Sequence, residues 1–461
     1  MRTYRWSDLS AADRIFALAR PAGRSDPALQ ASVRAIVDDV RARGWDALCE
    51  HAERLDGETP RLVPVAAAAS EARAALSREQ IDAIEVAHRN ITAFHTGSIP
   101  ADHVVETMPG LTVRKTWRAI DRVGLYIPGG RTPLFSTLLM LAIPAQAAGV
   151  GEIIVVTPPH PGGGLDPVIA FAAQLCGVEA IWTVGGAQAI AALAFGAGDI
   201  PAVAKICGPG NAWVAEAKTY VSSLPQGPAI DMPAGPSELL VIADDTADPA
   251  RVAADLLGQA EHDAAAQVVL VTPSARLADA VVGKLDALAR DLPRSIIALA
   301  SLTQARAILV ADLREAVAVS NLYAPEHLSL AVDDPDVLIS AIRNAGAIFA
   351  GHLAAETFGD YLAGSSHVLP TDGGARAWSG ISALSFMKSI TVQHVTSVAA
   401  QSIAAPAAAL ARMEGLEAHA RAADARLPVE NARSSPAKAG AQPLGVTRLD
   451  PGLRRGTEAM A

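Results

Sequence analysis

The sequence predicts an α/β protein in which two units of parallel strands alternate with helices. Short β-branched and apolar runs are each followed by a helical pattern, which is typical of parallel sheets covered on both faces. Two of these runs end in the same Thr-Pro step, at 157–158 and 272–273, and each continues into a helix. The repeated ending suggests two similar halves within one chain.

Length and composition agree with this class. The chain has 461 residues, which is enough for two or three domains with substantial cores. Half of it is hydrophobic (51%) but only 4% is aromatic, so small side chains must pack the helices closely. A net charge of −10 argues against a general nucleic-acid-binding protein, because neutralising phosphates needs a basic surface.

Cysteine usage and hydropathy exclude two further classes. Cys49, Cys176 and Cys207 are too few and too scattered for a disulfide framework or a cysteine-based zinc site. No apolar run approaches the roughly 18 residues that a membrane span needs, and residues 1–21 carry charges where a signal peptide would be apolar. We therefore expect no membrane partner and a cytoplasmic location.

The first quarter of the chain is predicted to be mainly helical. Residues 1–22 resemble a short charged arm, and helical periodicity then extends over 26–96 with a capping-box spacing at 77–80. Residues 107–123 indicate two short paired strands around a turn at Pro109-Gly110.

The two strand–helix units follow. The predicted strands of the first unit are 123–127, 152–157 and 180–184, with helices at 136–148 and 167–176. Those of the second unit are 238–243, 267–273, 328–332 and 347–350, with a helix at 249–261. Residues 382–427 are predicted to be mainly helical, whereas 428–461 lacks apolar periodicity and is predicted to be a disordered tail.

Glycine-rich turns end several predicted strands of the first unit. They are Pro128-Gly-Gly130, Gly185-Gly186 and Gly208-Pro-Gly-Asn211, although no Gly-x-Gly-x-x-Gly dinucleotide motif is present. Glycines at the carboxyl ends of parallel strands let phosphates approach the backbone and a helix N-terminus. Each turn alone is also an ordinary tight turn, so a nucleotide crevice and plain turns remain equally open.

A rigid stretch precedes the second unit. Residues 230–238 contain two prolines and a glycine, which fix the backbone just before an apolar strand. The stretch either links the units rigidly or points the Ser237 hydroxyl into a cleft.

Two pairs of side chains could carry metal and proton chemistry. Gln259 and His262 are three residues apart, so a helix presents both on one face. Glu326 and His327 follow a proline, and each can act as a general base near neutral pH. Either pair alone is uninformative, because such pairs are common on protein surfaces. With Asp360 and His419, Gln259 and His262 would form a nitrogen and oxygen ligand set that suits zinc, manganese or cobalt.

Taken together, the stretches resemble the histidinol dehydrogenase family from about residue 10 to residue 427. The motifs that carry the resemblance occur in the family's order: Val123-Gly-Leu-Tyr-Ile-Pro-Gly-Gly130, Gly185-Gly-Ala-Gln188, Gly208-Pro-Gly-Asn-Ala-Trp213, 230–238, Gln259-Ala-Glu-His262, Ala324-Pro-Glu-His-Leu328, Gly359-Asp-Tyr361 and His367-Val-Leu-Pro-Thr371. Each motif is weak alone, but so many in register are specific.

The resemblance implies a fold and a division of the chain into domains. The expected fold is α/β, with two incomplete Rossmann-like parallel-sheet domains plus a small helical N-terminal arm and a C-terminal extension. The expected domains are an arm at 1–22, a metal and catalytic domain at 23–125 with 238–381, an NAD-binding domain at 126–237, a helical dimerisation segment at 382–427 and a disordered tail at 428–461.

The resemblance also implies the reaction and the site. The family oxidises L-histidinol through histidinal to L-histidine with NAD and zinc, in the last steps of histidine biosynthesis. Zinc would be held by Gln259, His262, Asp360 and His419, the last from the partner subunit of a homodimer. Glu326 and His327 would be the catalytic bases. Ser237 would bind substrate together with these ligands and bases and with Glu414 from the partner, and NAD would contact Tyr126, Gln188 and Asn211.

Several positions depart from the family's usual residues. Ser366, Ser385, Ser389 and Asp263 stand where Asn, Asp, Arg and Gly are usual. None of these departures removes a proposed ligand or base, but they could retune substrate choice or dimer contacts.

One alternative is a paralogue that oxidises another small alcohol, such as a sulfonated propanediol. Glu414, which would pair with an ammonium group, favours histidinol instead. The other alternative is a zinc-stabilised dimer without catalysis, against which the adjacent bases Glu326 and His327 argue.

Overall fold

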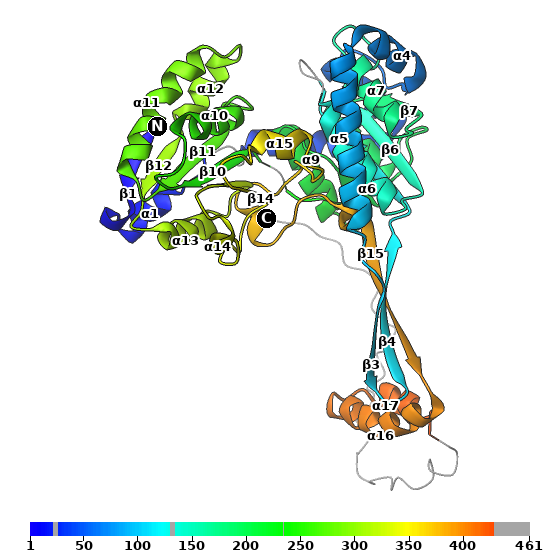
Figure 1. Cartoon of the computed structure of the whole chain (residues 1–461). Coiled ribbons are helices and arrows are strands. Elements are labelled where there is room, and N and C mark those ends of the chain that lie inside the picture. Colours follow the sequence, from blue (N-terminus) through cyan, green and yellow to red (C-terminus); the bar gives the residue numbers. More distant parts are fainter. Residues whose placement is uncertain (22–25, 130–133, 234, 428–461) are drawn as a thin grey trace, which may run out of the picture. The chain divides into compact units, whose positions relative to one another are not determined.

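The computed structural model describes residues 1–21, 26–129, 134–233 and 235–427 (Figure 1). The chain divides into two compact units. Unit 1 comprises 1–101 with 117–390, and unit 2 comprises 102–116 with the chain from Thr391 onward. The tail that we predicted at 428–461 lies outside the described residues.

One six-stranded sheet of unit 1, here called sheet I, has the order β2-β7-β6-β5-β8-β9. Its neighbouring strands are parallel except for the β2/β7 pair. The strands are β2 (Leu62–Pro64), β5 (Arg122–Tyr126), β6 (Glu152–Thr157), β7 (Ala180–Thr183), β8 (Lys205–Cys207) and β9 (Ala229–Ile230).

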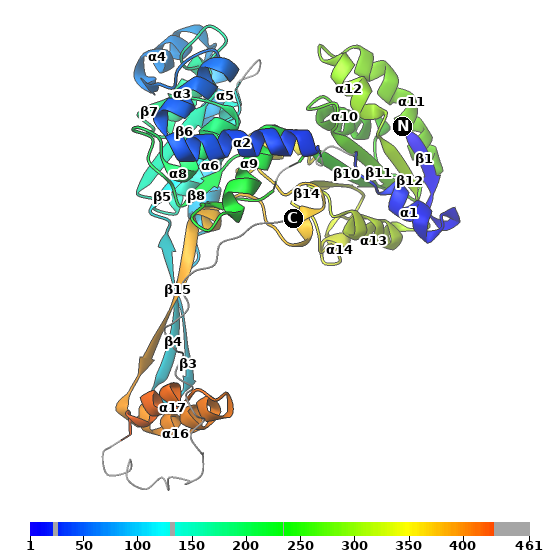
Figure 2. The same cartoon turned by 180° about the vertical axis from the view of Figure 1, so that it is seen from behind.

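Helices cover both faces of sheet I, as Figures 1 and 2 show from opposite sides. One apolar cluster contains α4 (Val65–Ala75), α5 (Arg78–Gly97), α6 (Phe135–Ala147) and α7 (Pro167–Leu175). The other contains α2 (Pro27–Arg43), α3 (Trp45–Leu55), α8 (Gly186–Phe195) and α9 (Ala212–Ser223). Helices α2 to α5 therefore pack on sheet I, whereas our sequence analysis grouped residues 23–125 with 238–381. Helical periodicity identifies the apolar face of such a helix but not the sheet that it covers.

The second six-stranded sheet of unit 1, sheet II, has the order β1-β12-β11-β10-β13-β14, and all its neighbours are parallel. The strands are β1 (Arg2–Arg5), β10 (Glu238–Ala243), β11 (Gln267–Thr272), β12 (Arg306–Leu309), β13 (His327–Ala331) and β14 (Ala347–Ala350). The expected strands at 238–243, 267–273, 328–332 and 347–350 are confirmed to within a residue or so.

Alternate residues of β10 enter opposite cores, as the two-residue period of a strand requires. Leu239 and Val241 join a cluster with α10 (Pro249–Ala260), α11 (Ala275–Arg290) and α12 (Ser295–Leu302). Leu240 and Ile242 join a cluster with Trp6 and with α13 (Leu313–Tyr323) and α14 (Asp336–Ile339). A strand buried on both faces has no polar alternation, which explains the continuous apolar run seen in the sequence.

The N-terminal arm is more ordered than its charged sequence indicates. Arg2–Arg5 form β1, which pairs in parallel with β12 at the edge of sheet II, and α1 (Ala11–Ala17) follows. At an edge the charged side chains reach water while the backbone pairs with its neighbour, so the charges do not prevent strand formation.

Unit 2 contains α16 (Ser397–Met413) and α17 (Glu417–Asp424). It also contains much of a three-stranded sheet with the order β15-β4-β3, formed by β15 (Met387–Val395), β4 (Leu111–Ala119) and β3 (His103–Met108). The paired strands expected around Pro109-Gly110 are confirmed. Residues 387–395 form a strand within a segment that we expected to be mainly helical. None of the described helices is long and apolar enough to cross a membrane.

A buried ion pair shapes the turn after β8. Lys218 Nζ lies 2.5 Å from Asp231 Oδ1, and both side chains are almost fully buried. The same ammonium donates to Gly208 O at 2.7 Å, while Gly208 N donates to Asp231 Oδ2 at 2.7 Å. Gly208 has φ of +126°, and a Cβ there would lie 2.1 Å from Tyr126 O, so only glycine fits.

Replacing Lys218 with Met should lower the free energy of unfolding by roughly 3–5 kcal/mol, because Asp231 would stay buried without its cation. Urea denaturation measures the loss. The matched control is Lys284→Met on the exposed face of α11, which should change stability by less than about 0.5 kcal/mol. Equal losses in both variants would contradict the structural importance of the buried pair.

Candidate active site

The carboxyl ends of the strands in sheet I carry two of the expected NAD contacts. Tyr126 ends β5, and its hydroxyl accepts a hydrogen bond from Gly186 N at 3.2 Å. Gln188 lies in the first turn of α8, where Nε2 donates to Asp56 Oδ2 at 3.0 Å. Gln188 Oε1 is buried without a partner in the described part of the chain. Leaving such an oxygen unpaired is costly, so a ligand donor at this edge would stabilise it.

The same edge holds an acid that the sequence analysis did not single out. Asp56 Oδ2 also accepts a hydrogen bond from Gly185 N at 3.0 Å. The backbone N–H group of Gly185, in the glycine-rich turn after β7, is therefore already paired with this carboxylate. Burial raises the pKa of Asp56, and the hydrogen bonds from Gly185 and Gln188 oppose that rise.

Asn211 caps α9, with Oδ1 accepting from Trp213 N at 3.1 Å and Val214 N at 3.2 Å. Asn211 directly follows the turn at Gly208, which is fixed by the hydrogen bonds of Gly208 with Lys218 and Asp231.

The expected bases lie at the amino ends of the strands in sheet II. Glu326 and His327 are buried at the start of β13, beside the start of β10. A single residue of β10 contacts both: Glu238 N donates to Glu326 Oε2 at 2.8 Å, and His327 Nδ1 lies 3.1 Å from Glu238 O. Because a carbonyl only accepts, Nδ1 carries the proton, which leaves Nε2 as the basic nitrogen.

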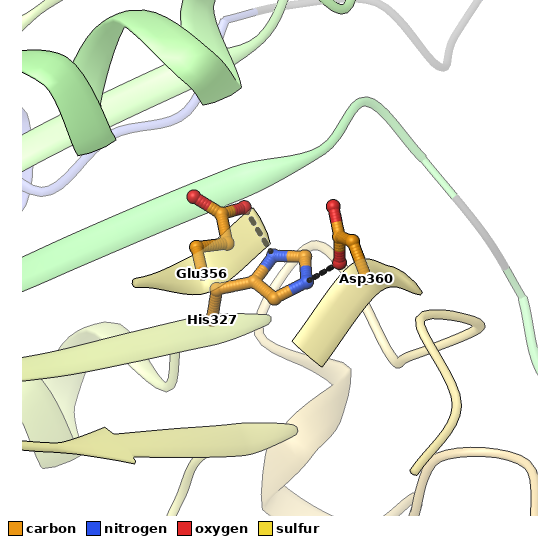
Figure 3. Close-up of side chains that lie close together, drawn as sticks. All are labelled: His327, Glu356 and Asp360. Carbon is orange, nitrogen blue, oxygen red and sulfur yellow. Dashed lines mark ion pairs between the residues drawn. The ribbon is translucent and has the colours of Figure 1, made fainter. Parts of the chain in front are cut away.

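Three carboxyl groups surround the imidazole of His327, and two of them, those of Glu356 and Asp360, are drawn in Figure 3. Nδ1 lies 3.3 Å from Glu356 Oε1 and 3.5 Å from Glu326 Oε2, and Nε2 lies 3.6 Å from Asp360 Oδ1. Burial lowers the pKa of His327, but these acids outweigh burial and raise it well above its ordinary value. Neutralising one of the carboxylates would lower this pKa, so that Nε2 loses its proton more readily and can accept one from a substrate.

Glu356 is a site residue that the sequence analysis missed. It begins α15 (Glu356–Tyr361), is almost fully buried, and lies one helical turn before Asp360. Burial raises the pKa of Glu356 to about 8, although the nearby His327 imidazole opposes this rise. His327, Glu356 and Asp360 each offer a ligand atom, and the atoms lie within 4.8 Å of one another. The spacing of four residues from Asp360 was the signal available in the sequence.

The expected metal ligands of unit 1 come from α10 and α15, which contact each other, and from the turn after α10. Gln259 lies in the last turn of α10, whereas His262, which we expected on the same helix, lies two residues beyond its end. Both amide atoms of buried Gln259 and the Oδ1 atom of Asp360 lack a hydrogen-bond partner among the described residues. Buried polar atoms are rarely left unpaired, so these oxygens fit a bound cation. His262 is exposed to solvent, yet desolvation by its surroundings lowers the pKa of its imidazole, an effect that the Asp360 carboxylate opposes. The neutral imidazole that this favours is the metal-binding form.

Two further residues of the expected site lie around this group. His367, which begins one of the family motifs, has Nδ1 3.1 Å from Asp360 O and Nε2 3.0 Å from Thr137 Oγ1 in α6. Ser237 is half-buried next to Glu238, and its carbonyl accepts from Gln267 N at 3.1 Å.

The remaining two expected residues lie in unit 2. Glu414 follows the last turn of α16 and His419 lies in α17, and both side chains are exposed.

The residues that depart from the family's usual pattern make local contacts. Ser366 Oγ accepts from Val368 N at 3.1 Å, and Ser385 Oγ accepts from Ser382 N at 3.1 Å. Asp263 Oδ1 accepts from Ala265 N at 2.8 Å, and Ser389 is exposed on β15. The hydrogen bonds of Ser366, Ser385 and Asp263 are local and are made with the backbone of residues two or three positions away, not with the ligands or bases.

Comparison with known proteins matches residues 19–427 to the family model described as histidinol dehydrogenase. The chain belongs to the histidinol dehydrogenase family. Every site residue discussed above lies within the matched range.

Close relatives of this family cover nearly the whole chain. Histidinol dehydrogenase of Xanthomonas campestris pv. campestris is 46% identical over 430 residues, covering 93% of this chain and all of the relative. That of Colwellia psychrerythraea is 45% identical over 423 residues, covering 92% and 98%. The crystal structure of histidinol dehydrogenase from Elizabethkingia anophelis is 40% identical, with a TM-score of 0.89 over 94% of this chain and 99% of that chain.

Replacing Glu356 with Gln should make the metal-free protein less sensitive to pH. The pKa of Glu356 is about 8 in the folded state, against an ordinary 4.5. The contribution of Glu356 to the free energy of unfolding is therefore greatest below pH 4.5 and is lost as the pH rises toward 8. Removing this titration should raise the variant's stability relative to the original by about 2 kcal/mol between pH 5 and pH 7.

Urea denaturation of chelator-treated protein measures this difference. Glu53→Gln, on the exposed face of α3, is the control and should show no such trend. A variant whose stability changes with pH in parallel with the original protein would show that Glu356 does not titrate in this range.

Proposed function

We propose that the protein oxidises L-histidinol to L-histidine through histidinal, transferring two hydrides to two molecules of NAD. The observation that carries this proposal is the joint anchoring of two buried bases, Glu326 and His327, on the peptide groups of Glu238. Unpaired buried oxygens of Gln259 and Asp360 lie in the same region. Membership of the histidinol dehydrogenase family supports the choice of substrate.

A divalent cation, in this family zinc, would be held by Gln259, His262 and Asp360 of one subunit and by His419 of the other. When bound, it would fix the orientation of the substrate through the imidazole and amine nitrogens of histidinol. Held at Asp360, the cation would also offset one of the negative charges that raise the pKa of His327. Ser237 and the partner's Glu414 would complete substrate binding, since a carboxylate suits the substrate ammonium group.

The first oxidation requires a base for the alcohol proton. In our proposal, His327 Nε2 accepts that proton while a hydride leaves the carbon for NAD, producing the aldehyde. The hydrogen bond from Nδ1 to Glu238 O holds the ring in the tautomer that this role needs.

The second oxidation requires water. Glu326, whose Oε2 is fixed by Glu238 N, would take a proton from the water that adds to the aldehyde. As the water adds, His327 would return the alcohol proton to the aldehyde oxygen, which completes the hydrate and leaves Nε2 unprotonated. His327 would then deprotonate the hydrate as a second hydride leaves for a second NAD, and the product is the carboxylate. Performing both steps in one enclosed site avoids release of a reactive aldehyde.

The NAD contacts would come from sheet I, in the domain that we assign to residues 126–237. The unpaired Oε1 of Gln188 and the glycine-only turn at Gly208 support this assignment. The hydrogen bond between Thr137 of α6 and His367 connects the helices of sheet I with the Asp360 region. In this proposal residues 238–381 supply the metal and catalytic groups, and the protein acts in the cytoplasm.

A homodimer would complete each site. Large apolar side chains on α16 are exposed in unit 2, including Val398 (71%), Leu410 (63%) and Met413 (83%). An apolar surface of this kind is typical of a protein interface. It lies on the same helical pair as Glu414 and His419, which supports the contribution of these two residues to the site of the partner subunit.

Zinc-loaded protein with excess NAD should release two NADH for each L-histidinol consumed and accumulate no histidinal. Glu326→Gln should slow the aldehyde-to-acid half by roughly 10²–10⁴-fold and the first oxidation much less, because only the second half needs an activated water. Stopped-flow measurement with histidinol and with histidinal separates the halves. Turnover of a sulfonated propanediol in place of histidinol would refute the proposed substrate, and equal slowing of both halves would refute the role of Glu326.

Mixing two variants that are each defective in forming histidine from histidinol tests the shared site, with histidine formation as the measured activity. Glu326→Gln and His419→Ala alter residues that would come from different subunits of one site. After random exchange of subunits in a 1:1 mixture, half of the dimers are mixed and each has one intact site of two, so about a quarter of the original activity should return. Activity that stays at the level of the separate variants, with exchange verified by mass spectrometry, would argue against sharing.

A further inference from the structure

The end of the N-terminal arm reaches the segment that carries the catalytic bases. The guanidinium of Arg20 forms a two-pronged ion pair with the buried carboxylate of Glu238: Nε lies 2.5 Å from Oε1, and Nη2 lies 2.8 Å from Oε2. The Arg20 side chain is only 18% exposed, and it stacks 4.0 Å from the centre of the Tyr323 ring. Oε1 of this carboxylate also accepts a hydrogen bond from Asp372 N at 2.8 Å.

The same guanidinium also contacts the chain just before the bases. Arg20 Nη2 donates to Tyr323 O at 2.9 Å and to Ala324 O at 3.3 Å. Ala324 has φ of +55°, a left-handed conformation that a non-glycine residue rarely adopts unless its surroundings hold it there. Arg20 supplies such a restraint two residues before Glu326.

One side chain is therefore joined to both segments that determine where the bases lie. Glu238 binds Glu326 through its N–H and His327 through its carbonyl, and Arg20 holds the side chain of Glu238. Residues 323–324 lead directly into Glu326, and Arg20 holds their carbonyls. A planar guanidinium can make all these bonds at once, whereas an ammonium is a point charge that cannot reproduce the fork.

We propose that Arg20 is a positioning residue for catalysis, which sets the relative placement of Glu326 and His327 through Glu238. This inference rests on the proposed function. It assigns a role in the active site to a segment that the sequence alone describes only as a charged arm.

A purely structural role must be separated from this one, because the arm has other attachments. Gln267 Nε2 donates to Ala19 O at 3.0 Å, and Arg14 Nη2 donates to Trp6 O at 3.2 Å. Arg14 is the matched control: its guanidinium also lies over an aromatic ring, 4.9 Å from the centre of Trp6, and also binds a backbone carbonyl. Both of these contacts are with Trp6, away from the Glu238 network.

The experiment compares Arg20→Lys with Arg14→Lys in the full-length, zinc-loaded protein. Arg20→Lys should lower kcat by roughly 10- to 100-fold for both histidinol and histidinal, since a misplacement of about 1 Å is enough for such a loss. KM for histidinol and NAD should change by less than about threefold, because the expected substrate, metal and NAD contacts are intact. Arg14→Lys should leave kcat unchanged, even if both variants melt at a lower temperature.

Chemical rescue provides a second variant. Arg20→Ala should lose activity more completely, and millimolar guanidinium chloride should restore part of it while having no such effect on Arg14→Ala. An unchanged kcat in Arg20→Lys would overturn the inference. A loss that follows only the fraction of unfolded protein, with no rescue, would also overturn it.

A readout that does not depend on turnover separates this inference from the proposed function. In zinc-loaded protein labelled with ¹⁵N-histidine, at a pH high enough that His327 is neutral, NMR reports the tautomer of His327, whose signal is identified by its absence in His327→Asn. Arg20→Lys should reduce the Nδ1–H tautomer, and Arg14→Lys should not. Failure of the original protein to oxidise histidinol would refute the proposed function, whereas an unaltered tautomer in Arg20→Lys would refute the role of Arg20.

Discussion

Balance of buried charge is the constraint on which the site depends. The carboxyl groups of Glu326, Glu356 and Asp360 lie around the single imidazole of His327, and Glu238 lies directly behind them. So many acids cannot be removed from water without compensation, because desolvation of each unpaired charge costs several kcal/mol. Arg20 compensates Glu238, and the raised pKa of Glu356 shows a second response, in which the acid tends to keep its proton. A cation bound at Asp360 would be a third way of compensating the buried negative charge.

The two sheets present their candidate site residues at opposite ends of their strands. In sheet I the candidate NAD contacts follow the carboxyl ends of the strands, where glycine turns leave the backbone open. In sheet II the candidate bases stand at the amino ends, where Glu238 and His327 begin neighbouring strands. The end of α10 reaches this edge because the helix runs opposite to the strand that precedes it, so Gln259 and His262 arrive beside the bases. The expectation that ligands bind at carboxyl ends therefore describes only one of the two sheets.

Much of the fold could be predicted because its signals are local. The strands at 152–157 and 238–243 are apolar runs bounded by turn residues, and the capping box at Ser77 and Gln80 forms as its spacing indicates. Strand β1 was missed because edge pairing is made by the backbone and leaves little trace in side-chain composition. The helices at 27–97 were grouped with residues 238–381 in the sequence analysis, whereas they pack on sheet I. The reason is related, because periodicity identifies the apolar face of a helix but not the sheet that this face covers.

The sequence by itself determined the chemical inventory: the amide, the imidazoles and the adjacent bases, together with the family to which their order belongs. Only the tertiary structure decided how these groups are held. Arg20 and Glu238 are 218 positions apart in the chain, and no pattern in the sequence connects them. Glu356 gains its significance from burial beside His327, which is a property of packing rather than of spacing. Residue types specify what chemistry is available, but the desolvation and contacts that tune it arise only when distant segments meet.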